Sequence, residues 1–552
     1  MARYYDLGTY GRAVTTQSNA AQRWFDRGLL WTYGFNHDEA VACFGKVLDH
    51  DPDCAMAWWG IANALGANYN KPWEAFDPDD LAACLATARH AVDEAMARRD
   101  GLTAVEAALI AALPARYPSA EPAEDLMPWI DAFADAMRAV HRAHPMDDDV
   151  CALFAEALMN RTPWALWDLK SGAIAEGADT AETAEVLETA LARREAAGAA
   201  PHPGLLHMYI HLMEMSPHPQ KALKACDALR GLVPDAGHLE HMPTHIDVLC
   251  GFYPSVLSSN QAAIEADRKF LEREGALNFY SLYRCHNYHF KIYGAMFAGQ
   301  YGPAIAAAEE MVSTLPAALL AIESPPMADW LEGFIAMKQH VLIRFGKWPE
   351  IIAQDLPDDR DLFRVTTAMI HYAKAVAHAA SGDVPGAEAE AVSFEAAAER
   401  VPESRYVFNN TCRDILAIAR EMMRGEIAYR RGDFDAAFAH LRTSVELDDN
   451  LPYDEPWGWM QPARHALGAL LLEQGRVAEA VQVYRADLGL DDTVPRACQH
   501  PDNVWSLHGY RDCLTRLGRT EEAILVKQRL DLANGRTDVP VKASCFCKQG
   551  SS

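Results

Sequence analysis

The stretch "AQRWFDRGLLWTYGFNHDEAVACFGKVLDHDP", residues 21–52, decides the fold. Its apolar residues recur at three- and four-residue spacing on both sides of the polar segment "GFNHDE", which predicts two helices joined by a turn. Ala40, at position 20 counted from Ala21, lets the two helices approach closely, and Pro52, at position 32, ends the second one. A second copy starts at Ala55 and breaks off in the insertion-like stretch "GANYNKPWEAFDPDD". The chain therefore begins as a helical repeat.

The composition of the whole chain limits the classes of function. The chain has 552 residues, of which 50% are hydrophobic, so it can bury a large core. Its formal charge of -27 repels phosphate backbones and anionic membrane surfaces, which argues against nucleic acid and membrane partners. No apolar run approaches the roughly 18 residues of a membrane span. The 12 cysteines are scattered without a C-x-x-C pair, so we expect reduced thiols in a cytoplasmic protein.

The same repeat frame recurs downstream. Position 20 is occupied again by alanine at Ala222, Ala304, Ala387, Ala437 and Ala480, and position 15 by glycine at Gly251, Gly299 and Gly346. With Trp at position 4, Gly at 8, Phe at 24 and Pro at 32 in the first copy, the pattern resembles the 34-residue tetratricopeptide repeat. The resemblance implies an all-α fold, a right-handed superhelix (α-solenoid) of antiparallel helix pairs with a concave groove. The segments "HMYIHLMEMS" and "GHLEHMPTHI" also resemble a group of long bacterial and fungal proteins of this superfamily with a histidine-rich centre.

The strength of the repeat pattern divides the chain into five segments. We expect an N-terminal repeat pair at 1–70, an irregular helical segment at 71–200, histidine-rich repeats at 201–365, C-terminal repeats at 366–535 and a flexible tail with a C-x-C motif at 536–552.

Seven histidines occupy matching positions of four successive repeats. His207 and His211 fall at positions 5 and 9 of one repeat, and His241 and His245 fall at the same positions of the next. The following repeats place His286 and His289 at positions 2 and 5, and His340 at position 9. In the tetratricopeptide family that these segments resemble, positions 2, 5, 9 and 12 of the first helix line the concave groove. The resemblance therefore implies that one groove collects all seven imidazoles.

Such a cluster predicts a metal site. A His-x-x-x-His pair on a helix presents two neutral nitrogens to one ion, and a facing pair can complete the coordination. The predicted metal ligands are His207, His211, His241, His245, His289, His340 and His286. Glu214, at position 12 on the same helical face as His207 and His211, is the predicted catalytic carboxylate. The donor set suits a transition metal ion, copper, iron or zinc, with room for one or two ions. A metal-free histidine-lined pocket and a coincidence of ordinary buried histidines are the alternatives.

Two neighbouring features are assigned separately. Because proline is tolerated only in the first turn of a helix, Pro243 predicts a helix start near Glu240 or His241. His238 then lies in the preceding turn, either as a residue that orients a ligand or as an ordinary solvated or capping residue. The stretch "ASCFCKQGSS" at 543–552 carries Cys545 and Cys547 after a polar segment. This pair is expected to bind a soft metal, to fold back over the groove as a lid, or to remain an idle pair of exposed thiols.

The favoured hypothesis is a metal-dependent enzyme with oxidoreductase or oxygenase chemistry on a small-molecule substrate held in the groove, because a nearly all-histidine ligand set is typical of redox centres. The first alternative is a repeat scaffold that binds a peptide of a protein partner through its repeat surfaces. The second is a metal-dependent hydrolase or a metal storage or sensing protein. The sequence lacks a Walker loop, a G-x-S-x-G motif and an H-E-x-x-H motif, so the commonest nucleotide and hydrolase classes do not apply.

Overall fold

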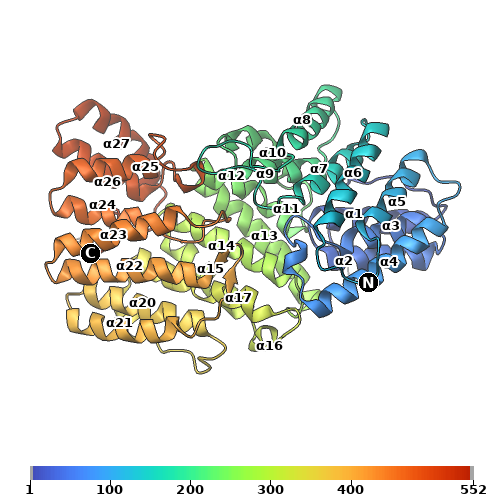
Figure 1. Cartoon of the computed structure of the whole chain (residues 1–552). Helices are drawn as coiled ribbons and strands as arrows, with labels where there is room; N and C mark the ends of the chain where they lie inside the picture. The colour runs from blue at the N-terminus through green and yellow to red at the C-terminus, as the bar shows by residue number, and fades with distance from the viewer. Residues whose placement is uncertain (1–3, 548–552) are drawn as a thin grey trace. The chain divides into compact units, whose positions relative to one another are not determined.

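The structure, a computed structural model, describes residues 4–547, and the regular secondary structure within this range is almost wholly helical. The exception is a two-stranded antiparallel hairpin, β1 (Tyr406–Val407) and β2 (Asn410–Thr411). Figure 1 follows the helices along the chain. The predicted all-α fold class is confirmed. The chain divides into two compact units: unit 1 runs to Ile246 and includes Ala262–Arg273, and unit 2 comprises Asp247–Gln261 and the residues from Glu274 onward.

Unit 1 contains the histidine-rich segment and most of the preceding helices. Its α-helices are α1 (Asn19–Tyr33), α2 (His37–His50), α3 (Ala55–Leu65), α4 (Pro78–Ala97), α5 (Ala104–Arg116), α6 (Met127–Ala143), α7 (Asp148–Met159), α8 (Thr180–Ala197), α9 (Pro203–Glu214), α10 (Leu223–Leu229) and α11 (Gly237–His241). Two 3-10 turns, η1 (Trp73–Ala75) and η2 (Pro219–Ala222), lie between them. The boundary between the units falls within α12 (Pro243–Leu249) and α13 (Tyr253–Glu274).

Unit 2 continues the succession of helices. Its α-helices are α14 (Ser281–Phe297), α15 (Tyr301–Ser313), α16 (Ala317–Leu320), α17 (Met327–Ile335), α18 (Met337–Arg344), α19 (Trp348–Ile352), α20 (Arg364–Ala380), α21 (Val384–Ala398), α22 (Cys412–Arg430), α23 (Phe434–Asp449), α24 (Ala463–Glu473), α25 (Val477–Asp487), α26 (Val504–Arg516) and α27 (Thr520–Asn534). A 3-10 turn, η3 (Arg496–Cys498), precedes α26.

Within each unit, helices that follow one another in sequence pack against one another. Unit 1 shows this for α1 with α2, α2 with α3 and α6 with α7, and unit 2 for α20 with α21, α22 with α23 and α24 with α25. The stretch predicted as irregular, 71–200, holds α4 to α8 and packs in the same serial manner. Each unit is thus a stack of helix pairs, as a solenoid requires.

The positions that carry the repeat pattern have the close packing and the backbone conformation that the sequence predicted. All six alanines at position 20 are fully buried: Ala40, Ala222, Ala304, Ala387, Ala437 and Ala480. A side chain at Gly28 would bring its Cβ within 2.6 Å of the Phe44 ring, so glycine permits the close packing of α1 on α2. The position-15 glycines Gly251, Gly299 and Gly346 have positive φ values and end their helices in the left-handed region.

Three local expectations are corrected or limited by the structure. The helix predicted to begin near Glu240 or His241 begins at Gly237, because α11 ends at His241 and Pro243 opens the next helix, α12. Cys545 and Cys547 form a disulfide, so the expectation of reduced thiols is wrong for this pair, while ten other cysteines form no disulfide. Of the predicted tail, residues 548–552 lie outside the described part of the chain, as do residues 1–3 of the first predicted segment. Among the described helices, none is both long and apolar enough to cross a membrane.

Candidate metal centre

The site in unit 1 is built on α9, whose N-terminus is fixed by a buried polar network. His202 caps the helix, since its Nδ1 accepts a hydrogen bond from the backbone N–H of Leu205 at 3.2 Å. Its Nε2 lies 3.2 Å from the Asp149 carboxylate, which also accepts hydrogen bonds from the hydroxyls of Tyr10 and Tyr33. These hydrogen bonds hold the pKa of Asp149 below its usual value, despite burial that raises it. The network therefore fixes the position of α9 relative to the C-terminal end of α1.

Five imidazoles form a closed ring beside α9. The ring centroids of His207 and His211 are 4.7 Å apart, those of His211 and His245 5.7 Å, and those of His245 and His241 4.8 Å. His238 closes the ring, 5.9 Å from His241 and 4.9 Å from His207. Each of the five side chains is at most 1% exposed. Residues from α9, α11 and α12 therefore converge on one buried space.

The outer nitrogen of His207 is anchored to the end of α1. Its Nδ1 lies 2.7 Å from the backbone carbonyl oxygen of Tyr33, the last residue of that helix. A helix leaves its last carbonyls without helical partners, so this oxygen is free to accept. Because a carbonyl only accepts, Nδ1 of His207 must donate, and in the neutral ring Nε2 is then the unprotonated nitrogen.

Glu214 anchors two further rings. Its Oε1 lies 2.9 Å from Nδ1 of His211, and its Oε2 lies 2.6 Å from Nδ1 of His245. A carboxylate that accepts from both rings fixes both tautomers, with the proton on Nδ1 and a lone pair on Nε2. Glu214, the predicted catalytic residue, is 1% exposed and is placed as the carboxylate that orients two imidazoles. Its predicted catalytic role stays a prediction.

The inner nitrogens face one another. Nε2 of His207 lies 3.1 Å from Nε2 of His238, and Nε2 of His245 lies 2.8 Å from Nε2 of His241. Nε2 of His211 is buried and has no hydrogen-bond partner among the described residues. Leaving a polar atom buried and unpaired costs about 1–3 kcal/mol. A ligand that binds this nitrogen would remove that cost.

Burial keeps the imidazoles neutral. Desolvation lowers the pKa of His211 to about 3, and it lowers the pKa of His207 well below its usual value, with a further decrease from the neighbouring His211. Neutral imidazole is the form that coordinates a metal ion, so these rings do not need to lose a proton at neutral pH before they bind one.

Aromatic side chains wall the ring of histidines. Phe35 contacts His207, His211 and His238, with ring centroids 4.5, 5.8 and 5.4 Å away. Its φ of 55° is unusual for a residue with a side chain, and such strain is concentrated at functional sites. Tyr69 packs on His211 at 4.8 Å. The wall excludes water on this side and lowers the local dielectric.

The structure brings together four of the predicted ligands, His207, His211, His241 and His245, in unit 1. His238 joins them, although the sequence placed it in a turn. The sequence carries a signal for His238, because residues 238, 241 and 245 have the i, i+3, i+7 spacing of one helical face. Phe35 and Tyr69 carry no comparable signal, since they reach the site from loops distant in sequence.

The other three predicted ligands belong to unit 2. His289 is fully buried, and its Nε2 lies 2.8 Å from Sδ of Met460. The ring of His340 lies 4.8 Å from that of Trp459, and the ring of His286 lies 4.7 Å from that of Phe408. That all seven imidazoles share one groove stays a prediction.

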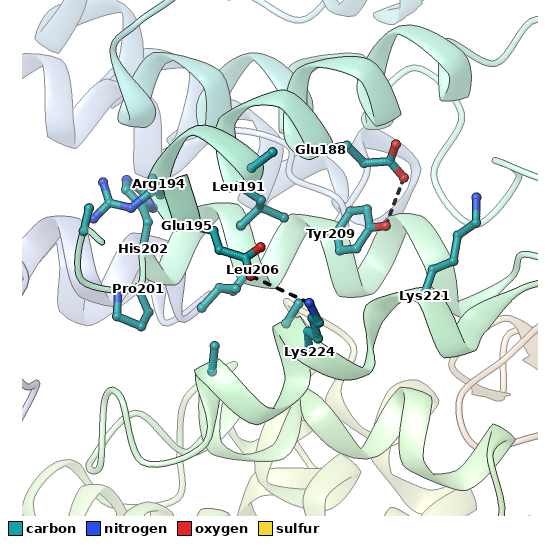
Figure 2. A pocket seen from close by; sticks show the side chains of 14 residues that line it. Glu188, Leu191, Arg194, Glu195, Pro201, His202, Leu206, Tyr209, Lys221 and Lys224 are labelled. Atoms are coloured by element: carbon teal, nitrogen blue, oxygen red, sulfur yellow. Dashed lines mark hydrogen bonds and ion pairs between the residues drawn. The ribbon is translucent and has the colours of Figure 1, made fainter. Parts of the chain in front are cut away.

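A surface cleft of about 510 Å³ lies on a different face of α9. Figure 2 shows Leu206 and Tyr209 of α9 facing α8 and α10 across this cleft, with the Tyr209 hydroxyl bonded to Glu188 and Lys224 paired with Glu195. No histidine of the ring lines it. The cleft is therefore separate from the candidate metal centre.

Comparison with known proteins supports the repeat architecture. The family model described as "Tetratricopeptide repeat" matches residues 463–497, which include α24 and α25. No curated protein matches the sequence. The match covers this one repeat, and buried alanines and left-handed glycines recur in the same frame elsewhere in the chain.

Solved structures of similar proteins include three at low identity. They are Naa15/Naa10 bound to HypK-THB (12% identity over 94% of this chain and 72% of that one, TM-score 0.21), yeast Tom70 (11%, 94% and 90%, TM-score 0.25) and the P58(IPK) TPR domain (13%, 83% and 99%, TM-score 0.20). Superpositions at this level carry no argument about the function of the present chain.

Proposed function

We propose that the five-imidazole ring of unit 1 with Glu214 is a transition-metal centre, and that it supports metal-dependent chemistry on a small molecule. One observation carries the proposal. Three buried imidazoles, those of His207, His211 and His245, each have Nδ1 held by an oxygen acceptor and so turn an unprotonated Nε2 into the ring. Histidines that bind metals in proteins have this arrangement, in which the second nitrogen donates to a carbonyl or carboxylate.

The distances between inner nitrogens fit cis ligands of one ion. With metal–nitrogen bonds of about 2.05 Å, two nitrogens at a right angle lie ~2.9 Å apart, and two at a tetrahedral angle lie ~3.35 Å apart. The observed separations of 3.1 and 2.8 Å are closer to the right angle. An N–H···N hydrogen bond accounts for the same separations, so metal binding itself is the deciding test.

The donor set favours particular ions. Imidazole nitrogens with one carboxylate suit copper, iron or zinc, whereas magnesium and calcium prefer oxygen. Of these, copper and iron readily accept the near-right-angle geometry of five- or six-coordinate sites. His207, His211 and His238 bring one ligand atom per residue within 4.8 Å of one another, which gives room for one ion. The Nε2 atoms of His241 and His245, 2.8 Å apart, give room for a second, adjacent ion.

Redox chemistry is the reaction class that this donor set supports best. A bound copper or iron ion supplies electron transfer or oxygen activation. The residues of the chain would hold the ion, keep its imidazoles neutral and exclude water on the side of Phe35 and Tyr69. Hydrolytic dinuclear centres commonly use more bridging carboxylates, and Glu214 is already bonded to two imidazoles.

Calorimetric titration with Cu²⁺, Fe²⁺ and Zn²⁺ under an inert atmosphere tests the proposal. The double variant His211→Ala/His245→Ala removes two inward Nε2 atoms, and we expect at least a hundredfold loss of affinity for the preferred ion. The matched control is His371→Ala, since His371 also pairs through Nδ1 with a glutamate, Glu390, but lies near the surface. Equal affinity in the double variant and the control would overturn the proposal. Bleaching of the Cu²⁺ electron paramagnetic resonance by ascorbate and its return in air tests the redox assignment.

The family match supports a second function, protein interaction. Tetratricopeptide repeats commonly bind protein partners, and the matched repeat belongs to unit 2, whereas the residues of the imidazole ring belong to unit 1. A third possibility, metal storage or sensing, relied on free thiols at Cys545 and Cys547, and these two residues are joined in a disulfide. The hypothesis of metal storage or sensing is therefore not supported by free thiols in this form of the chain.

A further inference from the structure

The segment after α27 continues without regular secondary structure, through bends and turns, and packs on other residues of unit 2. Asp538 fixes its start, because its carboxylate accepts hydrogen bonds from the backbone N–H groups of Tyr301 and Gly302 at 2.6 and 2.7 Å. These are the first residues of α15, so Asp538 satisfies donors that the helix itself leaves free. Gln300 adds a hydrogen bond from its side chain to the carbonyl of Arg536 at 2.8 Å.

Ser544 is the most deeply placed residue of the segment, at 1% exposed. Its hydroxyl donates to the carbonyl of His465 at 2.9 Å and lies 2.5 Å from the hydroxyl of Tyr484. Its own carbonyl accepts from the guanidinium of Arg344 at 3.3 Å. Each polar group named here has a partner on α18, α24 or α25, which is the pattern of a recognised residue rather than of a chance contact.

Arg344 is an unusual partner. It is 5% exposed, it forms no ion pair with residues 4–547, and its guanidinium lies 3.8 Å from the ring centre of Trp505. Its NH2 group donates to Nδ1 of His465, whose Nε2 lies 2.9 Å from the carboxylate of Asp487. The Ser544 carbonyl is therefore one of the few acceptors that this buried cation has, and a backbone carbonyl at this point lowers the cost of burying it.

A second contact point follows two residues later. Phe546 lies against Gly346, where an added Cβ would come within 2.9 Å of the Cβ of Phe546, and its ring centroid is 5.9 Å from that of Trp505. The carbonyl of Cys547 accepts from Arg430 of α22. A cavity of about 30 Å³, enough for one or two waters, lies between Cys545, Cys547 and the surrounding helices. The segment therefore packs closely on the helices at this point.

The contacts come from helices far apart in sequence. Arg344 belongs to α18, Arg430 to α22, His465 to α24, Tyr484 to α25 and Trp505 to α26. These five residues define the segment groove, a surface within unit 2. It binds two backbone carbonyls through arginines, one small hydroxyl side chain and one aromatic side chain. Most of these contacts would be met by another chain that carries serine and, two positions later, phenylalanine in the same turned conformation.

We propose that the segment groove is a docking site for a turned peptide with a Ser-x-Phe core, and that residues 541–547 occupy it as an internal ligand. A partner segment of this chemistry binds after the internal one is displaced. The proposal concerns unit 2 alone and does not depend on the metal centre.

Competition between the internal segment and a free peptide tests this proposal. The probe is a fluorescent peptide of residues 541–547 with its Cys545–Cys547 disulfide closed, measured by fluorescence anisotropy. The host is the full chain carrying Ser544→Arg/Phe546→Ala, in which the internal segment no longer fits. A short tether gives the internal segment an effective concentration on the order of millimolar, so the peptide should bind the variant at least about tenfold more tightly than the wild type.

Controls separate docking from general effects on the chain. Lys542→Ala, at an exposed position of the segment, should leave peptide affinity at the wild-type value. A peptide with arginine in place of Ser544 should bind neither protein. Equal binding to wild type and variant, or no binding to the variant, overturns the proposal. If the double variant does not fold, hydrogen exchange on the wild type decides: excess peptide should speed the exchange of residues 541–547, and unchanged exchange contradicts the proposal.

Discussion

The substitution Glu214→Gln examines the central feature of the metal centre with little change in shape. The glutamate accepts hydrogen bonds from Nδ1 of both His211 and His245. A glutamine has one oxygen that accepts and one amide nitrogen that only donates, so it can hold one of the two rings in the required tautomer. The other ring loses its acceptor or turns its proton inward, toward the position of the metal.

The magnitude of this effect follows from the lost contact. A hydrogen bond to a charged group contributes about 1.5–3 kcal/mol, and carboxylates that orient metal-binding histidines change metal affinity by about 10- to 100-fold. We therefore expect Glu214→Gln to weaken binding of the preferred ion by about 10- to 100-fold, or about 1.4–2.7 kcal/mol, without abolishing it. A total loss of binding would instead indicate that Glu214 is itself a ligand.

Competition with a chromophoric chelator measures the change in dissociation constant. The matched control is Glu390→Gln, which breaks a 2.6 Å contact with Nδ1 of His371 outside the site. The control should bind the ion as the wild type does. An unchanged dissociation constant in Glu214→Gln would refute the assignment of Glu214 as the carboxylate that sets both tautomers.

Three further predictions concern other parts of the chain. His238→Ala should weaken metal binding in calorimetry as much as His241→Ala does, and an affinity equal to the wild type would exclude His238 from the centre. Gly468→Ala places a Cβ 2.6 Å from the Tyr484 ring and should lower the free energy of unfolding by about 1–3 kcal/mol in chemical denaturation, whereas an unchanged midpoint would count against close packing of α24 on α25. Burial, with the charge of Asp449, raises the pKa of Asp448 to about 7 from 3.8, so the folded chain keeps a proton that the unfolded chain loses. The free energy of unfolding should then fall by up to ~4 kcal/mol as pH rises from about 4 to about 7, and Asp448→Asn should remove this slope; equal slopes in urea titrations at several pH values would contradict it.

The repeat fold could be predicted from the sequence because its constraints are local. Helix pairs need a small residue where they cross and a left-handed residue where the first one ends, and both recur at fixed spacing. Ala40 and Ala480 are fully buried as the frame requires, and Gly299 and Gly346 have positive φ. Helical periodicity also identified α9 as a helix with His207 and His211 on one face.

The remainder of the site depends on contacts that sequence spacing does not encode. Tyr33 supplies its carbonyl to His207 across 174 positions, and no pattern marks a backbone acceptor. Phe35 was part of a segment that looked like an ordinary polar turn, yet it walls the ring. Pro243 predicts a late start of one helix and so places His238 in a turn, whereas in the structure Pro243 begins a second short helix and His238 lies in the first. The contacts of Ser544 could not be predicted from sequence spacing either, because they join the segment to three helices that are distant in sequence.

Elemental analysis of the protein as isolated tests the central claim most directly. The wild type and the control His371→Ala should contain one or two equivalents of copper, iron or zinc per chain, and His241→Ala/His245→Ala should lose most of it while keeping its helical circular dichroism. Absence of stoichiometric transition metal from all three proteins, or an equal content in all three, would contradict a metal centre built on these imidazoles.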